Sequence, residues 1–332
     1  MPTELGPLRF QRHFLEKVWG GRALERRPGF SLPDDVPIGE TWEVVDRAKE
    51  NSVVAEGGPE GVTLRELMES HGDDLLGKAP ATPDGRFPLL VKYLDASDNL
   101  SVQVHPDEAM AAQIGGGAEA KTEAWYVVDC EPGGVLYAGL KPEVTAEEFG
   151  RVADSQGVLD LLNRWEVRPG DCMLVPGGTV HAIGKGVTIL EVQQNSDTTY
   201  RIWDWGRMGL DGTPRETHVP QALRSTAFGA PPRGPVRPVW LEEGTVKKAP
   251  LARSNFFGMN ALRVRGESRL STGGQFQMYA VVGGRGSLRT KDSPRRMLSA
   301  GDVWLVPAAC GYHWVAPEDD DELELVQLLY RA

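Results

Sequence analysis

The stretch GDCMLVPGGTVHAI at residues 170–183 has a near copy later in the chain, GDVWLVPAACGYHW at residues 301–314. Five of the first seven residues are identical, and each copy places a histidine soon after its proline. A short apolar run between glycine and proline predicts a strand followed by a turn. Because repetition of one unit at a long interval indicates a duplicated domain, we expect two related β-domains.

The sequences around the two copies extend the duplication. Upstream, EAWYVVDCEPGGVLYAG at 123–139 resembles FQMYAVVGGRGSLRT at 276–290, and a strand pattern follows each copy, TILEVQQ at 188–194 and LELVQLL at 323–329. These runs are apolar, short and bounded by turn residues, which predicts a mainly β fold. The expected strands include residues 87–96, 123–129, 170–177, 187–194, 277–284 and 301–308.

Helix signals are few and lie in the first half. Capping boxes begin at Thr63, with Glu66, and at Thr145, with Glu148. They predict small helical insertions at about residues 60–80 and 143–165. The proline- and arginine-rich stretch after the first copy reads as a linker. The predicted organisation is a first domain over residues 1–230, a linker over 231–240 and a second domain over 241–332.

The composition limits the possible partners. The chain has 332 residues, of which 40% are hydrophobic and 25% charged, and a net charge of −11, which argues against nucleic acid or an anionic membrane as the partner. Three cysteines without a CxxC pair favour a reducing compartment. The first residues lack the apolar core of a signal peptide, so we expect a cytoplasmic protein. The sequence leaves the oligomeric state open.

Four residues near strand ends form a candidate metal site. Gln103 and His105 are two apart on a predicted strand and therefore share a face. Glu123 begins the next strand pattern, and His181 follows the turn of the first copy. Two imidazoles, a carboxylate and an amide oxygen suit one divalent ion. Taken singly, a histidine on a strand is more often a hydrogen-bonded structural residue than a metal ligand.

The second copy lacks this set. Gln277 stands in the place of Glu123, and Tyr312, next to His313, stands in the place of His181. Only the first domain is therefore expected to bind metal.

Two cations near these residues are candidates for chemistry. Lys121 lies two before Glu123, and Arg201 follows the strand that leaves the predicted site. A lysine beside a metal has its pKa lowered and can act as a base. The alternatives are a solvated lysine at a strand end and an arginine that pairs with Asp197 or Asp204 in a turn.

The chain resembles the type I mannose-6-phosphate isomerases of the short bacterial form, which are zinc-dependent proteins with two cupin domains. The Gln-x-His-Pro-Asp and Ser-Asp-Thr-Thr-Tyr-Arg segments are the most specific matches. The second half matches only as a degenerate cupin. The matching stretches are residues 16–24, 38–44, 87–108, 120–129, 170–183 and 190–207.

The resemblance implies two cupin jelly-roll barrels or sandwiches and a set of site residues. It implies one Zn²⁺ per chain, although other divalent ions fit such ligands. Lys121 and Arg201 match the family's catalytic lysine and arginine. Trp19 and Glu40 match its sugar pocket. The candidates for the phosphate are Arg201, which is the strongest, and Lys92, Lys185 and Arg207. The implied metal ligands are Gln103, His105, Glu123 and His181.

The implied reaction is the interconversion of mannose 6-phosphate and fructose 6-phosphate through a cis-enediol. Longer members carry a His-Lys-Pro-Glu run where this chain has Ala-Lys-Thr-Glu at 120–123, so the proton-transferring base is not assigned. Three alternatives stay open: another cupin sugar-phosphate isomerase, a non-haem metal oxygenase, and a non-catalytic sugar-binding protein with two cupin domains.

Overall fold

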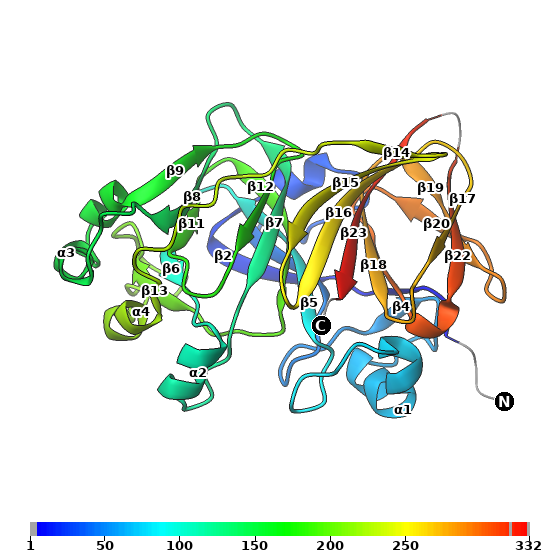
Figure 1. The fold of residues 1–332 in the computed structure, drawn as a ribbon, viewed down its shortest axis with the longest axis horizontal. Helices are drawn as coiled ribbons and strands as arrows, with labels where there is room; N and C mark the ends of the chain where they lie inside the picture. The colour runs from blue at the N-terminus through cyan, green and yellow to red at the C-terminus, as the bar shows by residue number, and fades with distance from the viewer. Residues whose placement is uncertain (1–4, 319–320, 331–332) are drawn as a thin grey trace.

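The computed structural model describes residues 5–318 and 321–330 and has the expected mainly β fold. Two β-sandwiches each consist of one large and one small sheet. The large sheets face each other across the middle of the molecule, and the small sheets lie on the outside (Figure 1). None of the helices in the described ranges combines the length and apolar character needed to span a membrane.

The large sheet of the first sandwich has the strand order β10-β7-β12-β5-β3-β2. These strands are β2 (His13–Gly21), β3 (Ile38–Val44), β5 (Leu89–Ala96), β7 (Glu123–Cys130), β10 (Cys172–Val175) and β12 (Val187–Gln194). The small sheet has the order β13-β6-β11-β8-β9. It consists of β6 (Val102–Val104), β8 (Val135–Leu140), β9 (Leu162–Glu166), β11 (His181–Ile183) and β13 (Tyr200–Trp203).

The second sandwich repeats this arrangement. Its large sheet runs β14-β15-β16-β23-β18-β21, and its small sheet runs β17-β22-β19-β20. The strands are β14 (Leu241–Glu243), β15 (Val246–Arg253), β16 (Phe257–Val264), β17 (Ser268–Ser271), β18 (Gln277–Gly283), β19 (Arg285–Thr290), β20 (Arg296–Ser299), β21 (Val303–Val306), β22 (Tyr312–Pro317) and β23 (Leu323–Tyr330). The registers also agree, because Glu123 pairs with Val175 and Gln277 pairs with Val306. The expected duplication is confirmed.

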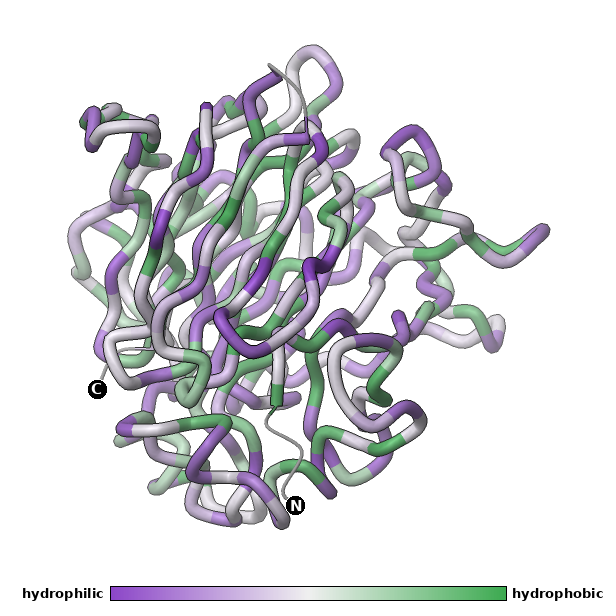
Figure 2. Tube along the Cα trace, turned by 90° about the vertical axis from the view of Figure 1, so that its right-hand side faces the viewer, coloured by the Kyte–Doolittle hydropathy of each residue, from purple (hydrophilic) through white to green (hydrophobic). Residues whose placement is uncertain are grey.

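The apolar strand patterns follow from burial on both faces of the large sheets. Along β7, Trp125 and Val127 point into the first sandwich, whereas Ala124 and Val128 join a core shared with the second sandwich. Alternate residues of a strand face opposite sides, so both sets must be apolar. The strands of the outer small sheet of the second sandwich instead carry hydrophilic as well as hydrophobic residues (Figure 2).

Among the described helices, α1 and α3 lie in the two predicted insertions, whereas α2 and α4 lie outside them and were not predicted. Both hydrogen bonds of the predicted capping box, between Thr63 and Glu66, are present at the first helix. The insertion at 143–165, expected to continue as helix to Trp165, ends instead in β9, because pairing with β8 captures its last residues. The helices are α1 (Leu64–Leu76), α2 (Glu108–Ile114), α3 (Ala146–Val152) and α4 (Val219–Ser225), and the 3₁₀ turns are η1 (Ala23–Arg26), η2 (Gln156–Leu161) and η3 (Ala308–Cys310).

The edges of the large sheets tie distant parts of the chain together. The strand β1 (Leu8–Phe10) pairs with β21 and with β4 (Val54–Glu56), so the N-terminal segment extends the sheet of the second sandwich. Val236, within the expected linker, pairs with Cys172 at the corresponding edge of the first. The boundaries at 230 and 240 stay a prediction, and the two halves are joined by more than the linker.

Candidate metal centre and sugar-phosphate cavity

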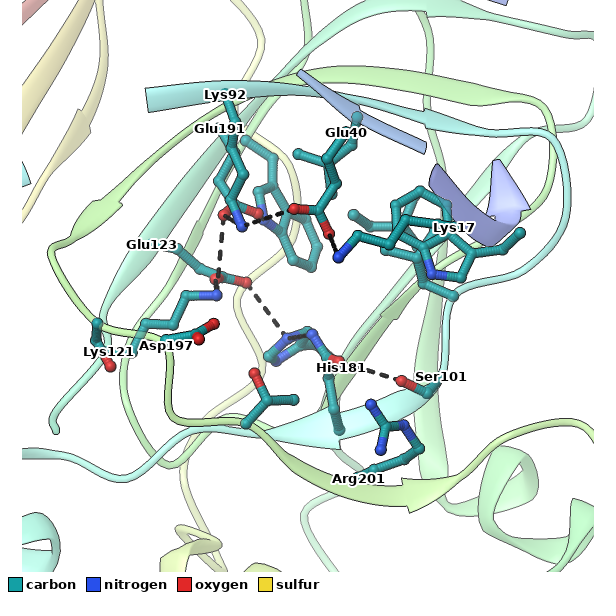
Figure 3. Close-up of a pocket in the computed structure, with 18 of the residues that line it drawn as sticks. Lys17, Glu40, Lys92, Ser101, Lys121, Glu123, His181, Glu191, Asp197 and Arg201 are labelled. Carbon is teal, nitrogen blue, oxygen red and sulfur yellow. Dashed lines mark hydrogen bonds and ion pairs between the residues drawn. The ribbon is translucent and has the colours of Figure 1, made fainter. Parts of the chain in front are cut away.

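A cavity of about 290 Å³ opens at one end of the first sandwich (Figure 3). Large-sheet strands supply Glu40, Lys92, Glu123 and Glu191, and the small-sheet strand β6 supplies Gln103. The wall also includes Lys17, Trp19, Trp42, Leu94, Leu100, Ser101, Lys121, Trp125, His181, Ile183, Ser196, Asp197, Thr199, Arg201, Arg215 and His218.

His105, Glu123 and His181 form a compact group of possible metal ligands. One ligand atom from each lies within 4.8 Å of the others, and all three side chains are buried. Glu123 and His181 each begin a strand, β7 and β11. His105 lies one residue past the end of β6, which is shorter than expected, yet its ring still reaches the group. Turns at strand ends therefore deliver all three side chains to one point.

Backbone carbonyls orient both imidazoles. His105 Nδ1 lies 2.8 Å from Thr198 O, and His181 Nδ1 lies 2.8 Å from Thr179 O. Each Nδ1 therefore carries the proton, and each Nε2 presents a lone pair toward Glu123, at 3.5 and 3.3 Å. Within the described residues, the buried His105 Nε2 has no hydrogen-bond partner. This buried acceptor fits a bound metal ion.

Gln103 is placed to complete the set. Its Nε2 lies 3.2 Å from His181 Nε2, and its Oε1 accepts from Ser101 Oγ at 3.2 Å. A half-turn of the amide about its last torsion exchanges the two atoms, and the Ser101 hydroxyl can donate or accept. The amide oxygen can thus join the two imidazoles and the carboxylate.

The electrostatics favour the protonation states that a metal requires. Burial lowers the pKa of His181 and holds the pKa of His105 well below its usual value, an effect to which Lys121 adds. Burial alone would raise the pKa of Glu123, but Lys121 and the two histidines hold it well below its usual range. Two neutral imidazoles and an ionised carboxylate result, which is the ligand state for a divalent cation.

Lysines and glutamates alternate away from this centre. Lys121 Nζ lies 2.7 Å from Glu123 Oε2 and 3.8 Å from Glu191 Oε1. Lys92 Nζ lies 3.1 Å from Glu191 Oε1 and 3.7 Å from Glu40 Oε2. Lys17 Nζ lies 3.4 Å from Glu40 Oε1. We call Glu123, Lys121, Glu191, Lys92, Glu40 and Lys17 the charge chain (Figure 3).

The carboxyls of the charge chain differ in their affinity for a proton. Burial would raise the pKa of Glu40, but Lys92 and Lys17 lower it to about 2. The pKa of Glu191 is instead raised, by burial first and then by the charge of Glu123. Glu191 is therefore the carboxyl of the charge chain that takes up a proton most readily.

The structure brings most of the predicted site residues together. Trp19, Glu40, Lys92, Lys121 and Arg201 line the cavity together with Gln103, Glu123 and His181, and His105 adjoins them. Lys121 is buried, which rules out the alternative of a solvated lysine. Arg201 Nη1 donates to Glu216 O at 2.8 Å rather than pairing with Asp197 or Asp204.

Two predicted residues lie elsewhere. Lys185 lines a separate cavity at the other end of β5 and β7, with Asp95 and Asp129. Arg207 is outside the wall of the main cavity and pairs with Asp204 at 2.9 Å and Asp98 at 3.1 Å.

Sequence reasoning missed several residues of the cavity. Glu191 carried a usable signal, because a charged residue in the apolar run TILEV requires a partner when the strand is buried. That partner is Lys92, directly opposite on β5. Arg215 and His218 lie in a polar segment that gave no such signal.

Comparison with known proteins agrees with the fold and identifies the family. The catalytic-domain profile of type I phosphomannose isomerases matches residues 8–136. A mannose-6-phosphate isomerase of Bacillus subtilis is 36% identical over 326 residues, covering 98% of this chain and 96% of that protein.

Solved structures agree too. The crystal structure of the Bacillus subtilis mannose 6-phosphate isomerase superposes with a TM-score of 0.87 at 32% identity, covering 97% of this chain and 99% of the other. A mannose 6-phosphate isomerase bound with zinc and yttrium shares the fold at 19% identity, with a TM-score of 0.77 over 98% of this chain and 100% of the other. The chain belongs to the type I phosphomannose isomerase family.

Proposed function

We propose that the protein is a metal-dependent aldose–ketose isomerase that interconverts mannose 6-phosphate and fructose 6-phosphate. The observation that carries the proposal is the His105–Glu123–His181 group at the wall of a cavity that also holds Lys121 and Arg201, in a member of this family. The substrate partner is thus a small sugar phosphate. A sequence of three cysteines without a CxxC pair is compatible with the cytoplasm as its place of action.

We further propose that one Zn²⁺ per chain is held by Gln103, His105, Glu123 and His181. Nitrogen and oxygen ligands of this kind suit zinc, and Mn²⁺, Fe²⁺ or Co²⁺ can occupy the same set. A divalent ion in this position supplies Lewis acidity toward the sugar oxygens. The second sandwich offers no matching group in the described ranges, which supports a single ion.

The reaction moves a proton between C2 and C1 of the open-chain sugar. Negative charge develops on oxygen when the C–H bond breaks, and a positive charge close to that oxygen would stabilise it. Two groups of the charge chain can carry the proton. Lys121 adjoins the ligand Glu123, and Glu191 has a pKa raised toward the working range of a general base.

Removal and return of metal tests the proposal. Chelator treatment of the purified protein should abolish conversion of mannose 6-phosphate, and stoichiometric Zn²⁺ should restore it. His181→Ala should lose both metal and activity. An apoprotein that stays active, or a metal-loaded protein that is inactive, contradicts the proposal. Full activity without oxygen separates an isomerase from an oxygenase, and metal analysis showing more than one ion per chain contradicts the stoichiometry.

The proton carrier needs a separate experiment, because a variant of a metal ligand should lose the metal and the activity together. Glu191→Gln keeps the shape of the side chain and does not touch the imidazoles. If Glu191 carries the proton, this variant should retain its metal but lose about 10²–10⁴-fold in kcat. Retention of kcat assigns the proton transfer to Lys121 or another group.

A further inference from the structure

A cluster of arginines lies beside the cavity, and one buried aspartate holds two of them. Asp204 follows β13, and its side chain is only 7% exposed. Arg215 places Nε 2.7 Å from Oδ2 and Nη2 2.5 Å from Oδ1, a two-pronged contact. Arg207 Nη2 approaches the same Oδ1 at 2.9 Å. Asp204 therefore fixes both the position and the plane of the Arg215 guanidinium.

Of this pair, Arg215 faces the cavity, where Arg201 and His218 also belong to the wall. Asp204 occupies Nε and Nη2 of Arg215 and leaves Nη1, which has no acceptor among the described residues. Arg201 contributes a second guanidinium to this wall, where its Nη1 donates to Glu216 O and its Nη2 has no acceptor in the described part of the chain. Two guanidinium groups thus present unused donors at the cavity.

The end of the cavity that holds the arginines differs in net charge from the end that holds the charge chain. Each lysine of the charge chain is matched by a glutamate, so the charges of these six side chains nearly cancel. The arginine end has three guanidinium groups around Asp204. The other carboxylates nearby are mostly in solvent, since the side chains of Glu216 and Asp98 are 84% and 54% exposed. A positive surplus remains.

This surplus has an energetic cost while no anion is bound. Burial lowers the pKa of Arg201, and the charges of Arg215 and Arg207 lower it further. A dianionic group between Arg201 and Arg215 would remove that repulsion and satisfy the open donors. Guanidinium groups match phosphate oxygens better than ammonium groups do, because their donors are planar and fixed.

We propose that Arg215, with Arg201, binds the phosphate of the sugar-phosphate substrate and that Asp204 is a positioning residue for Arg215. This inference rests on the proposed function. Arg201 and Ser101 lie on the side of His181 away from Lys121 and Glu191 (Figure 3). A sugar phosphate carries its phosphate at the opposite end from C1 and C2, so the two ends of the cavity suit the two ends of the substrate.

Steady-state kinetics of the zinc-loaded protein test the assignment. Arg215→Gln should raise KM for mannose 6-phosphate by about 10- to 100-fold, which is the usual effect of losing a charge-assisted hydrogen bond to an anion. The inhibition constant of inorganic phosphate should rise in parallel, while kcat at saturation changes much less. Arg215→Lys keeps the charge but loses the two-pronged contact, so it should restore only part of the affinity.

Asp204→Asn tests the positioning role. It should raise the same two constants by a smaller factor, and it should add little when combined with Arg215→Gln, because both changes act through one guanidinium. Arg65→Gln is the matched control. Arg65 pairs with the fully buried Asp46 at 3.0 Å and is 28% exposed, against 23% for Arg215, but it lies outside the cavity. Its KM and phosphate inhibition should stay at the wild-type values.

The outcomes separate the two proposals. A zinc-loaded wild-type protein that does not convert mannose 6-phosphate refutes the proposed function. An active wild type whose Arg215→Gln and Arg215→Lys variants keep the original KM and phosphate inhibition overturns the phosphate assignment alone. A loss confined to kcat also overturns it, because Arg215 would then act in the chemistry. Zinc content and the thermal unfolding midpoint of each variant identify any variant that is misfolded. If Arg215→Gln is misfolded, the kinetics of Arg215→Lys decide the test.

Discussion

The two sandwiches use the same strand positions for opposite chemistry. Glu191 on β12 lies opposite Lys92 and Trp125 on the neighbouring strands. Gln327 on β23 lies opposite Asn260 and Tyr279 in the same way. The corresponding pairs are Lys92 and Asn260, Glu123 and Gln277, Trp125 and Tyr279, and Glu191 and Gln327. Every charged residue of the first set is replaced by a neutral amide in the second.

The amides of the second sandwich satisfy one another. Asn260 Nδ2 donates to Gln327 Oε1 at 3.0 Å, and Gln327 Nε2 donates to Gln277 Oε1 at 3.0 Å. Tyr279 O–H donates to Gln277 Oε1 at 2.8 Å, and its oxygen lies 2.8 Å from His313 Nε2. The network closes on the backbone, where Gln277 Nε2 donates to Ser271 O at 2.7 Å.

The difference shows what converts a polar sheet end into a reactive site. An amide is both donor and acceptor, so a cluster of amides can close on itself at little electrostatic cost. A buried carboxylate needs a cation, and that cation needs a further carboxylate, which yields the charge chain. The first sandwich retains an unpaired imidazole nitrogen beside an ionised carboxylate, whereas the second has neither a carboxylate nor a free histidine nitrogen at these positions.

Glu123→Gln gives the first sandwich the residue of the second and should have the largest effect. Loss of an anionic ligand should reduce metal affinity and activity by more than the ~10–100-fold that loss of an outer partner costs. Metal analysis after dialysis and the initial rate with mannose 6-phosphate measure the two effects. Retention of metal at wild-type affinity would show that the carboxylate does not distinguish the two halves.

Gln277→Glu makes the reciprocal change. The new carboxylate accepts from Tyr279 and Gln327 but places its second oxygen against Ser271 O, with no cation nearby. We expect a loss of about 3–5 kcal/mol in the free energy of unfolding at pH 8, without gain of a second metal ion. The folded pKa of this carboxyl should be raised, so the loss should shrink as the pH falls toward that value. Denaturant titrations at pH 8 and pH 5 that give the same loss would contradict this account.

His313 links the comparison to pH. Burial lowers the pKa of His313 to about 4, below the ~6.5 of an exposed histidine. The folded protein therefore binds this proton more weakly than the unfolded chain, and stability is lost as the pH falls from about 6.5 toward 4. Between pH 7 and pH 4.5 the wild type should lose about 2–3 kcal/mol more than His313→Gln. Parallel pH profiles for the two proteins would show that His313 does not contribute.

The parts of the fold that were predictable are those fixed by local pattern. The strands at 187–194 and 277–284 were found because apolar runs end at turn residues, and the near copies at 170 and 301 aligned the two halves. The strand β9 was missed because a helix-like sequence after Thr145 yields to pairing with β8. The joining of β1 to β21 spans almost the whole chain, and no local signal reports it.

The site divides in a similar way. The candidate metal ligands were identified from motifs, and His105, Glu123 and His181 of that set lie close enough together to hold an ion. Glu191 could have been found from its place within an apolar strand. Arg215 could not, because its role depends on the loop that folds it back on Asp204, eleven positions earlier. Lys185 shows the opposite kind of error. It was predicted to bind the phosphate because it follows His181 closely in the sequence, but it lines a different cavity.

Arg27 contacts both sandwiches, and its replacement should have the smallest of the effects predicted for this protein. Its Nη1 donates to Val128 O at 3.1 Å and its Nη2 to Val282 O at 2.8 Å. These two residues occupy corresponding places near the ends of β7 and β18, so one guanidinium bridges equivalent carbonyls of both sandwiches. Arg27→Met should lower the free energy of unfolding by about 1–2 kcal/mol, the scale of losing hydrogen bonds to a charged group, with kcat and KM unchanged. A variant of wild-type stability would mean that the shared apolar core alone holds the two large sheets together, and Arg27→Lys, which can reach only one carbonyl at a time, should fall between the two.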